Sequence, residues 1–297
     1  MRRLIIPLCA GVLSVAWAQE GAEGPFTCDR TAAITPLAEV AFTGEVASYT
    51  DAERACWADW PQAQALAQGL NGQWVDVRDA GSARRIALRG AATVGLTDLA
   101  DKAFLKGQSL VLVGTGVDLK ALTERCVALR QRGQFSGVHV LLGGARTWRL
   151  AGQPVQADGT AVAPDEASAQ ELWLGAAGDL WQLAVFGLSA EQRQSLPVPA
   201  SRVLDLGADA RRAVDELQRR ATTGERLAAP RQWLVVAPDA AQLAQAQALW
   251  RERAQAASPL GAPIWLSGGW QAYAAYLQQQ KTLAAHAGRP LPRLCGM

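Results

Sequence analysis

The sequence predicts an α/β protein of two units, each a mainly parallel sheet flanked by helices. Short, continuous apolar runs such as Leu110–Val113 and Val138–Leu142 have the length and composition of strands buried on both faces. Between them, the amphipathic segment Leu119–Arg132 ends at Gly133, a usual helix terminator. Strand and helix therefore alternate, which is the pattern of parallel sheets with helical crossovers.

The size and composition are those of a globular protein with two domains. The chain has 297 residues, of which 49% are hydrophobic and 19% are charged, so it can bury an extensive core. Its formal charge is +2, and setting Arg2 and Arg3 aside leaves 27 basic residues against 27 acidic ones. A neutral chain without basic clusters offers no electrostatic surface for nucleic acid.

Residues 1–18 have the pattern of a signal peptide. Two arginines precede an apolar run from Leu4 to Val15, and Ala16-Trp17-Ala18 then supplies small residues for cleavage. This run is shorter than the roughly 20 residues that a helix needs to cross a bilayer. We therefore expect an exported chain, periplasmic or secreted, that does not span a membrane after cleavage. A lipoprotein anchor at Cys9 is the alternative, although Leu8 is bulky for such a signal.

Export would place the cysteines in an oxidising compartment, where disulfides form. Four cysteines follow the leader: Cys28, Cys56, Cys126 and Cys295. Cys126 lies on the apolar face of the predicted helix Leu119–Arg132, which favours a buried, unpaired residue. The pairing Cys28–Cys56 is favoured because it would fix the N-terminal segment, and Cys295 could compete for either partner.

The elements can be followed in order. Residues 19–58 show no regular period and are expected to form an N-terminal extension before a first domain at residues 59–155. The elements expected in that domain are a helix at Asp59–Leu70, a strand at Trp74–Arg78, a small helix at Leu99–Lys106, the strand Ser109–Val113, the helix Leu119–Arg132, the strand Val138–Leu142 and a helix at Ala145–Leu150. Residues 156–170 are small, polar and unpatterned, which indicates a linker. A second domain is expected at residues 171–297, with a C-terminal tail from Gln278.

The second domain repeats features of the first. The matching pairs are Val203–Leu206 with Val75–Val77, Trp233–Val236 with Leu110–Val113, Ile264–Gly269 with Val140–Gly144, and Tyr273 with Trp148. In this alignment Gly207 stands in the place of Arg78. We therefore expect the second copy to be degenerate.

An ordered set of short motifs runs through the first domain. These are Asp76 and Arg78 after the first strand, then Gly90-Ala91, Gly143-Gly144, Trp148 and Gly152-x-Pro154-Val155. In this order they resemble the rhodanese family, in which tandem domains are a known arrangement, and the resemblance implies two rhodanese-like domains. It also implies sulfur transfer on a cysteine in the loop after the strand that ends at Val113, where a helix N-terminus holds the thiolate. We interpret the Asp76–Arg78 pair as structural, because it can fix neighbouring loops.

The loop that should hold this cysteine has no thiol. It reads Gly114-Thr115-Gly116-Val117-Asp118, and the corresponding loop of the second domain contains Ala237, Pro238 and Asp239. Asp118 and Asp239 precede helices and are expected to be N-caps, worth about 1 kcal/mol each, so that a carboxylate fills the place of an anionic sulfur. Alternatively, they line a pocket for a cationic or polar ligand. No catalytic residue is assigned.

Other kinds of site find no support in the sequence. Thr115 has no nearby histidine to act as a base, because His139 lies in a predicted strand and His286 in the tail. These histidines and the scattered cysteines do not make a metal site. The segment Gly114-Thr115-Gly116 lacks the further residues of a nucleotide-binding loop. We therefore expect neither a metal nor a cofactor.

These patterns together indicate an exported, catalytically inactive rhodanese-like protein that binds a protein partner or a small ligand. Trp57 and Trp60 are the candidate residues of a partner-binding surface. The alternative is a sulfurtransferase that uses an unusual cysteine, such as Cys56 or Cys295. A carrier that holds a small ligand in the hollow of the former active site is a third hypothesis.

Overall fold

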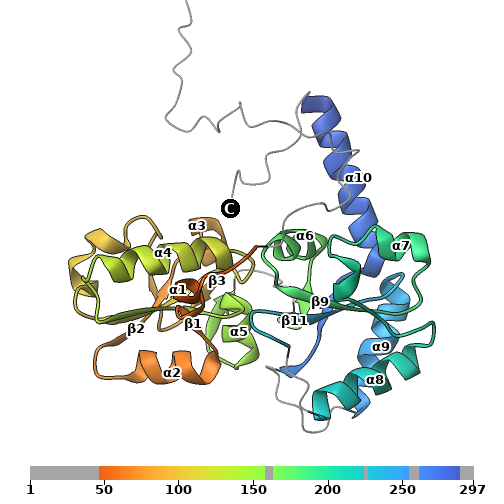
Figure 1. The fold of residues 1–297 in the computed structure, drawn as a ribbon, viewed down its shortest axis with the longest axis horizontal. Helices are drawn as coiled ribbons and strands as arrows, with labels where there is room; N and C mark the ends of the chain where they lie inside the picture. Colours follow the sequence, from red (N-terminus) through yellow and green to blue (C-terminus); the bar gives the residue numbers. More distant parts are fainter. Residues whose placement is uncertain (1–46, 158–162, 224–226, 254–260, 288–297) are drawn as a thin grey trace, which may run out of the picture.

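Two α/β units lie side by side in the protein (Figure 1). The computed structural model describes residues 47–157, 163–223, 227–253 and 261–287. Each unit is built on a five-stranded sheet whose strands are all parallel, which confirms the expected fold class. The expected leader, Cys28 and Cys295 lie outside the described residues.

The first sheet has the strand order β1-β6-β5-β2-β4. Its strands are β1 (Trp57–Ala58), β2 (Gly72–Asp76), β4 (Ala92–Thr93), β5 (Ser109–Val113) and β6 (Gly137–Leu141). The central strand, β5, is buried from Leu110 onward, as its continuous apolar sequence predicts. Helix α4 (Leu119–Gln131) covers one face of the sheet, and α2 (Trp60–Gln68) and α5 (Gly144–Leu150) cover the other (Figure 1).

Shorter elements complete this unit. They are α1 (Asp51–Arg54), α3 (Ala80–Arg85), β3 (Ile86–Leu88), η2 (Leu99–Asp101), η3 (Ala103–Leu105) and β7 (Val155–Ala157). Strands β3 and β7 pair antiparallel, with Leu88 opposite Val155. The helix predicted at Leu99–Lys106 is instead two 3₁₀ turns, because Lys102 between them has an extended backbone (φ −80°, ψ 105°) that ends the first turn.

The second sheet has the strand order β10-β9-β11-β12-β8. Its strands are β8 (Glu166–Ala167), β9 (Trp181–Val185), β10 (Val203–Asp205), β11 (Gln232–Val236) and β12 (Ile264–Leu266), and its helices are α6 (Ala169–Ala177), α7 (Ala190–Gln194), η4 (Ala200–Arg202), α8 (Ala210–Thr222), α9 (Ala240–Arg253) and α10 (Gly269–Ala287). Helices α8 and α9 cover the face opposite to α6 and α10 (Figure 1). Because α10 continues to Ala287, helix replaces the start of the tail expected from Gln278.

The two sheets have the same topology. Read from the matching edge, β8-β12-β11-β9-β10 corresponds to β1-β6-β5-β2-β4. In the first sheet Asp76 is in register with Val113, and in the second Val185 is in register with Val236. Val185 therefore occupies the position of Asp76.

The internal repeat was only partly predicted. The matches of Trp233–Val236 and Ile264–Gly269 are confirmed, because these segments form β11 and β12 with the turn that follows. The match of Val203–Leu206 to the Asp76 strand is wrong, since Val203–Asp205 is β10, the counterpart of β4. The counterpart of the Asp76 strand, β9, carries no Asp-x-Arg motif, so the sequence pattern pointed to the next aspartate along the chain.

The first unit begins before residue 59. Strand β1 pairs with β6, and α1 precedes it, so the described end of the expected extension at residues 19–58 belongs to this unit. The second unit likewise begins inside the expected linker at residues 156–170. There, β8 pairs with β12, and Ser168 caps α6 through its hydroxyl.

A disulfide joins Cys56 to Cys126 across 70 residues of sequence, and both side chains are fully buried. It links the residue before β1 to the middle of α4. The favoured pairing of Cys28 with Cys56 and the expectation of an unpaired Cys126 are therefore both wrong. Cys126 does lie among apolar neighbours such as Leu122 and Leu129. Position on an apolar face cannot distinguish a paired from an unpaired cysteine.

The units are stacked so that the carboxyl edge of the first sheet faces the amino edge of the second. Thr115 and Gly143 follow β5 and β6, and they line one pocket with Trp181 and Gln232, the first residues of β9 and β11. One apolar cluster continues from one unit into the other. Within the described ranges, no helix is both long and apolar enough to cross a bilayer.

Candidate functional site

The candidate site is the loop after β5, at the edge of a parallel sheet where ligands usually bind. This loop interlocks with the Gly143-Gly144 turn, since Ala145 donates its backbone N–H to the Gly114 oxygen at 2.9 Å. Gly116 has a φ of 103°, and a Cβ there would lie 2.7 Å from the Gly143 oxygen. Gly144 has a φ of 53°, and a Cβ there would lie 2.4 Å from the Gly114 oxygen. Both positions therefore require glycine.

The carboxylate of Asp118 occupies the inside of this loop. It accepts the backbone N–H of Thr115 at 3.1 Å and that of Gly116 at 3.2 Å. It makes no side-chain cap bond to α4, so the expectation that Asp118 caps this helix is wrong. The reason is the turn at residues 115–117, which aims its own amides at the carboxylate before the helix begins. The carboxylate therefore bonds the amides of the loop and not those of the helix.

The described cysteines are not available to this loop. The loop residues carry no thiol, and Cys56 and Cys126 are joined in the buried disulfide. The Thr115 hydroxyl accepts the N–H of Val117 at 3.3 Å. His139 lies in β6, half-buried, with Nδ1 3.2 Å from Nη2 of Arg130. Burial and the charge of Arg130 lower the pKa of His139, so the ring is neutral at pH 7.

The Asp76–Arg78 pair is buried at the end of β2. Nε and Nη2 of Arg78 donate to the two carboxylate oxygens of Asp76 at 2.8 and 2.6 Å. Nη2 also donates to the Ile86 oxygen at 2.6 Å, at the start of β3. Such a two-bond, charge-assisted pair is geometrically specific, and it joins the end of β2 to β3, as expected of a structural pair.

The remaining motif residues also have structural positions. Gly90, with a φ of 89°, forms the exposed turn between β3 and β4, and Ala91 packs against the apolar cluster on the α2 face. Trp148 is buried and donates its indole N–H to the Pro154 oxygen at 3.3 Å. Its ring meets those of Trp60 and Trp74 edge-on, with centroids 6.1 and 5.0 Å away.

The two tryptophans expected at a partner surface are instead part of the packing. Trp60 stacks on Trp74 at 5.5 Å, and Trp57 meets Tyr49 edge-on at 5.0 Å. Both are only partly exposed. Their positions beside β1 explain this, because the residues around β1 belong to the first unit and not to a separate extension.

The corresponding loop of the second unit is shorter and differently built. Asp239 accepts the N–H of Gln242 at 2.9 Å and is thus the helix cap that the sequence predicts. Trp270 donates its backbone N–H to the Ala237 oxygen at 2.7 Å, in the manner of Ala145 and Gly114. Pro238 packs beside Gly187. Tyr273, at the place of Trp148, is buried, its hydroxyl has no bonding partner within the described chain, and burial raises its pKa.

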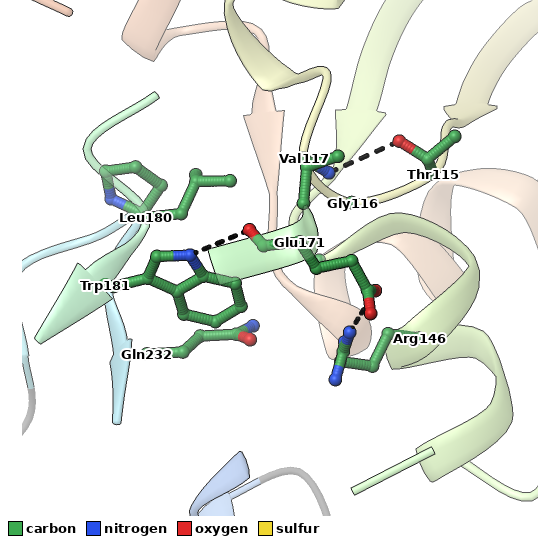
Figure 2. A pocket seen from close by; sticks show the side chains of 10 residues that line it. Thr115, Gly116, Val117, Arg146, Glu171, Leu180, Trp181 and Gln232 are labelled. Atoms are coloured by element: carbon green, nitrogen blue, oxygen red, sulfur yellow. Dashed lines mark hydrogen bonds and ion pairs between the residues drawn. The ribbon is translucent and has the colours of Figure 1, made fainter. Parts of the chain in front are cut away.

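The second unit covers the loop of the first. A small, partly open pocket lies between them, with a volume of about 10 Å³, enough for about one water molecule. It is lined by Thr115, Gly116, Val117, Gly143, Arg146, Glu171, Leu180, Trp181, Pro230 and Gln232. Figure 2 shows Arg146 and Glu171 paired across it and the Trp181 indole donating to the Glu171 backbone oxygen. Arg146 also donates to the Glu166 oxygen. Arg146 and Glu171, the charged residues of the pocket, therefore hold the two units together.

An N-terminal strap, residues 47–54, adds a second link between the units. Ala47 donates its N–H to the Ala177 oxygen at 3.1 Å, and the Tyr49 hydroxyl donates to the Gly178 oxygen at 2.7 Å, both at the end of α6. On the first unit, buried Glu53 pairs with Lys120 of α4, whose Nζ lies 5.3 Å from the centre of the Tyr49 ring. Burial and the nearby Glu53 charge raise the pKa of Tyr49 to about 12.

Sequence reasoning missed the charged pairs at the strap and between the units. Glu53 and Glu171 each belong to a Ser/Thr-x-x-Glu capping box, which is visible as a helix start at Thr50 and Ser168. These two capping boxes would have predicted that the first unit begins near Thr50 and the second near Ser168. The partners are not recognisable from sequence, because Arg146 meets Glu171 across the two units, and Lys120 meets Glu53 through the packing of α4 on α1 within the first unit.

The fold and site together define a parallel α/β protein with a loop-and-helix motif at the carboxyl edge of each sheet. No protein-family model and no curated protein match the chain. A rhodanese-3-like domain of the Alr3790 protein from Anabaena is 25% identical over 28% of this chain and 97% of that one, with a TM-score of 0.25. Thiosulfate sulfurtransferase from Pseudomonas aeruginosa is 16% identical over 74% of this chain and 42% of that one, with a TM-score of 0.29. SseA from Escherichia coli, described among 3-mercaptopyruvate sulfotransferases, is 13% identical over 72% and 98%, with a TM-score of 0.28. At these TM-scores, none of the three gives this chain an activity or a substrate.

Proposed function

We propose that this chain is an exported, catalytically inactive rhodanese-like protein of two units, which acts by binding a protein or a small polar ligand. The observation that carries the proposal is the Asp118 carboxylate on the amides of Thr115 and Gly116. A sulfur-transfer site needs such amides to hold a thiolate or an anionic sulfur donor. With a carboxylate already bound to them, the loop repels anions.

The covering of the loop supports the same proposal. A sulfur donor and an acceptor must both reach the reacting atom, and the loop of the first unit faces Trp181 and Gln232 of the second. The nearest polar groups, Arg146 and Glu171, are paired with each other. The geometry thus favours a stable two-unit scaffold over a site through which substrates pass.

The competing hypothesis is a sulfurtransferase that uses another cysteine. Cys56 is unsuited to this role because it is fully buried and joined to Cys126. Cys295 lies outside the described residues, so it has to be tested directly.

The test is transfer of sulfane sulfur from thiosulfate to cyanide, measured as thiocyanate formed by the full chain. We expect the same rate as in buffer without protein, for the full chain and for Cys295→Ser alike. Thiocyanate formation that is lost in Cys295→Ser, or on alkylation of free thiols, would show that the chain is an enzyme and end the proposal.

A small polar ligand is a second candidate, and it would have to part the two units, because the pocket between them has a volume of only about 10 Å³. Thr115, Arg146 and Gln232 bring a hydroxyl, a guanidinium and an amide to one place. Native mass spectrometry of the protein purified without denaturant tests this candidate. A bound mass that is present in the wild-type chain and absent from Gln232→Ala would support it, and an unmodified mass in both would favour protein binding.

A further inference from the structure

Helix α6 (Ala169–Ala177) lies on the side of the second unit that meets the first (Figure 1). The first unit holds this helix at both of its ends, near Glu171 and near Gly178. These two attachments are about 10 Å apart along the helix axis, because each residue of a helix adds about 1.5 Å. Separation of the units at one end of α6 therefore does not require separation at the other.

The attachment at the start of α6 is charged and is backed by the covalent chain. Arg146 of α5 pairs with Glu171 in the first turn, as Figure 2 shows, and it also donates to the Glu166 oxygen. Glu166 is fixed within the second unit, because its carboxylate accepts the Ser267 hydroxyl at 2.8 Å. The chain passes from β7 of the first unit to β8 of the second at this end, since β8 begins at Glu166.

The attachment at the end of α6 consists of two neutral hydrogen bonds from the strap, residues 47–54. Ala47 donates its backbone N–H to the Ala177 oxygen at 3.1 Å. Tyr49 donates its hydroxyl to the Gly178 oxygen at 2.7 Å. A neutral hydrogen bond is about half as strong as a charge-assisted one. The strap end is therefore the weaker of the two attachments.

The strap itself is anchored on the first unit. Lys120 of α4 pairs with buried Glu53 and donates to the Ser48 oxygen at 3.1 Å. The disulfide of Cys56 with Cys126 fixes the chain shortly after the strap. The bonds to α6 are therefore the ones that break when the strap and the second unit part.

The pocket between the units is too small for a ligand while they are in contact. Its volume of about 10 Å³ holds about one water molecule. Leu180 and Trp181, which line it from the second unit, are buried. A larger molecule therefore reaches this pocket only when the two units part.

We propose that the strap is a clasp and that the Arg146 end of α6 is a hinge. When Ala47 and Tyr49 release α6, the second unit swings away from the loop after β5, and the charged pair at the hinge stays intact. Hinged opening of two units about a few residues is a common way in which proteins uncover a site. The proposal does not rest on the proposed binding function, because it concerns the chain without a ligand.

Distances between paired spin labels measure this opening in the full chain. The clasp pair is Ala52→Cys with Ala200→Cys, two exposed positions. Ala52 lies in the strap. Ala200 lies near the end of α6, because Arg202 of the same turn pairs with Asp179.

The hinge pair is Gln156→Cys with Gln170→Cys, again two exposed positions. Gln156 lies in β7 and Gln170 in the first turn of α6, on either side of the crossing between the units. Cys9, Cys28 and Cys295 are replaced by serine in every protein, so that the labels attach at the chosen positions and the disulfide is kept.

Two substitutions loosen the clasp in different ways. Tyr49→Phe removes the hydroxyl and keeps the ring, and Ala47→Pro removes the backbone N–H. We expect either one to enlarge the long-distance population of the clasp pair by about 2- to 10-fold, the effect of one neutral hydrogen bond, and to leave the hinge pair unchanged. Tyr276→Phe, which removes a hydroxyl from α10, is the matched control and should give the wild-type distances.

Three outcomes would overturn the proposal. The first is a clasp pair that keeps its wild-type distances in both strap variants. The second is an equal lengthening of both pairs, which would mean that the units separate as a whole. The third is a lengthening of the hinge pair alone. Where one strap variant loses its helical circular dichroism, the other decides between these outcomes and the expected one.

Discussion

At the scale of single residues, Asp118 decides what the loop after β5 can hold. Its two oxygens take the amides of Thr115 and Gly116, which would otherwise be free to bind an anion. From the sequence alone, Asp118 could equally have been the N-cap of α4. The choice between the two depends on the turn at Gly116, whose φ of 103° directs the amides inward.

Removal of this carboxylate should expose the amides. We expect Asp118→Ala to lose about 1–2 kcal/mol of unfolding free energy, because two hydrogen bonds to a charged acceptor are lost. Inorganic sulfate should then raise the melting temperature of the variant more than that of the wild type. Urea unfolding and thermal melts with and without sulfate measure both effects. Asp101→Ala, outside the loop, is the control, and an equal response of all three proteins to sulfate would contradict the role given to Asp118.

Glu53 should make the stability depend on pH in acid. Burial alone would raise the pKa of Glu53, but hydrogen bonds from Lys120 and Thr50 outweigh it and keep the pKa below its ordinary value of 4.5. The stabilisation is therefore complete above pH 4.5 and is lost as the pH falls through the lower folded-state value.

We expect Glu53→Gln to cost about 1–2 kcal/mol near neutral pH and to flatten the decline in stability below pH 4.5. Urea unfolding at a series of pH values measures this. Glu124→Gln removes the more exposed carboxylate that faces the same Lys120 at 3.5 Å, and it should change little. Equal effects of the two substitutions would show that the buried pair has no special role.

At the scale of elements, the disulfide fixes the edge of the first sheet. It joins the residue before β1, a strand of two residues, to the centre of α4. So short an edge strand has few ladder hydrogen bonds of its own. The strap that precedes β1 also reaches the second unit, through Ala47 and Tyr49.

We expect Cys126→Ala to lose about 2–4 kcal/mol of unfolding free energy, because the unfolded chain is no longer cross-linked. Non-reducing urea unfolding measures this loss, and Cys295→Ser is the control. A digest of the unreduced protein should release the Cys56 peptide joined to the Cys126 peptide. A Cys28–Cys56 peptide instead would contradict the observed pairing.

Much of the element pattern was predictable from sequence. Continuous apolar runs predicted β5, β6, β11 and β12, and an amphipathic period predicted α4, because these signals are local. The strand β9 was not matched to β2, since Val185 stands where Asp76 would identify it. The disulfide was not predicted because it depends on β1 lying beside β6, a contact between distant segments.

The candidate site was predictable to a similar degree. The position of the loop and the lack of a thiol in it follow from residues 114–118 alone. The acceptor role of Asp118 and the covering by Trp181 do not, because both are set by three-dimensional contacts.

At the scale of the whole molecule, the second unit covers the loop after β5, because the carboxyl edge of the first sheet faces the amino edge of the second. Arg146 is central to it, since its side chain is 10% exposed and bonds both the Glu171 carboxylate and the Glu166 oxygen of the second unit. These charge-assisted bonds hold α5 against β8 and α6.

We expect Arg146→Ala to lower the unfolding free energy by about 1.5–3 kcal/mol, the usual size for hydrogen bonds to charged groups. Loss of this contact should also uncouple the units, so that calorimetry shows two transitions where the wild type shows one. Arg85→Ala, an exposed arginine of the first unit, is the matched control. A single transition of unchanged midpoint in Arg146→Ala would mean that the strap alone couples the units.

The acid held inside the loop also limits any attempt to engineer sulfur chemistry into this scaffold. A Cβ at Gly114 would lie 2.3 Å from Cδ1 of Leu122 and 2.6 Å from Oδ1 of Asp118. A cysteine substituted for Gly114 by itself would thus collide with Leu122 and Asp118. A thiol at this position would therefore require changes at Asp118 and at Leu122 together, and no single substitution of Gly114 would supply one without these collisions.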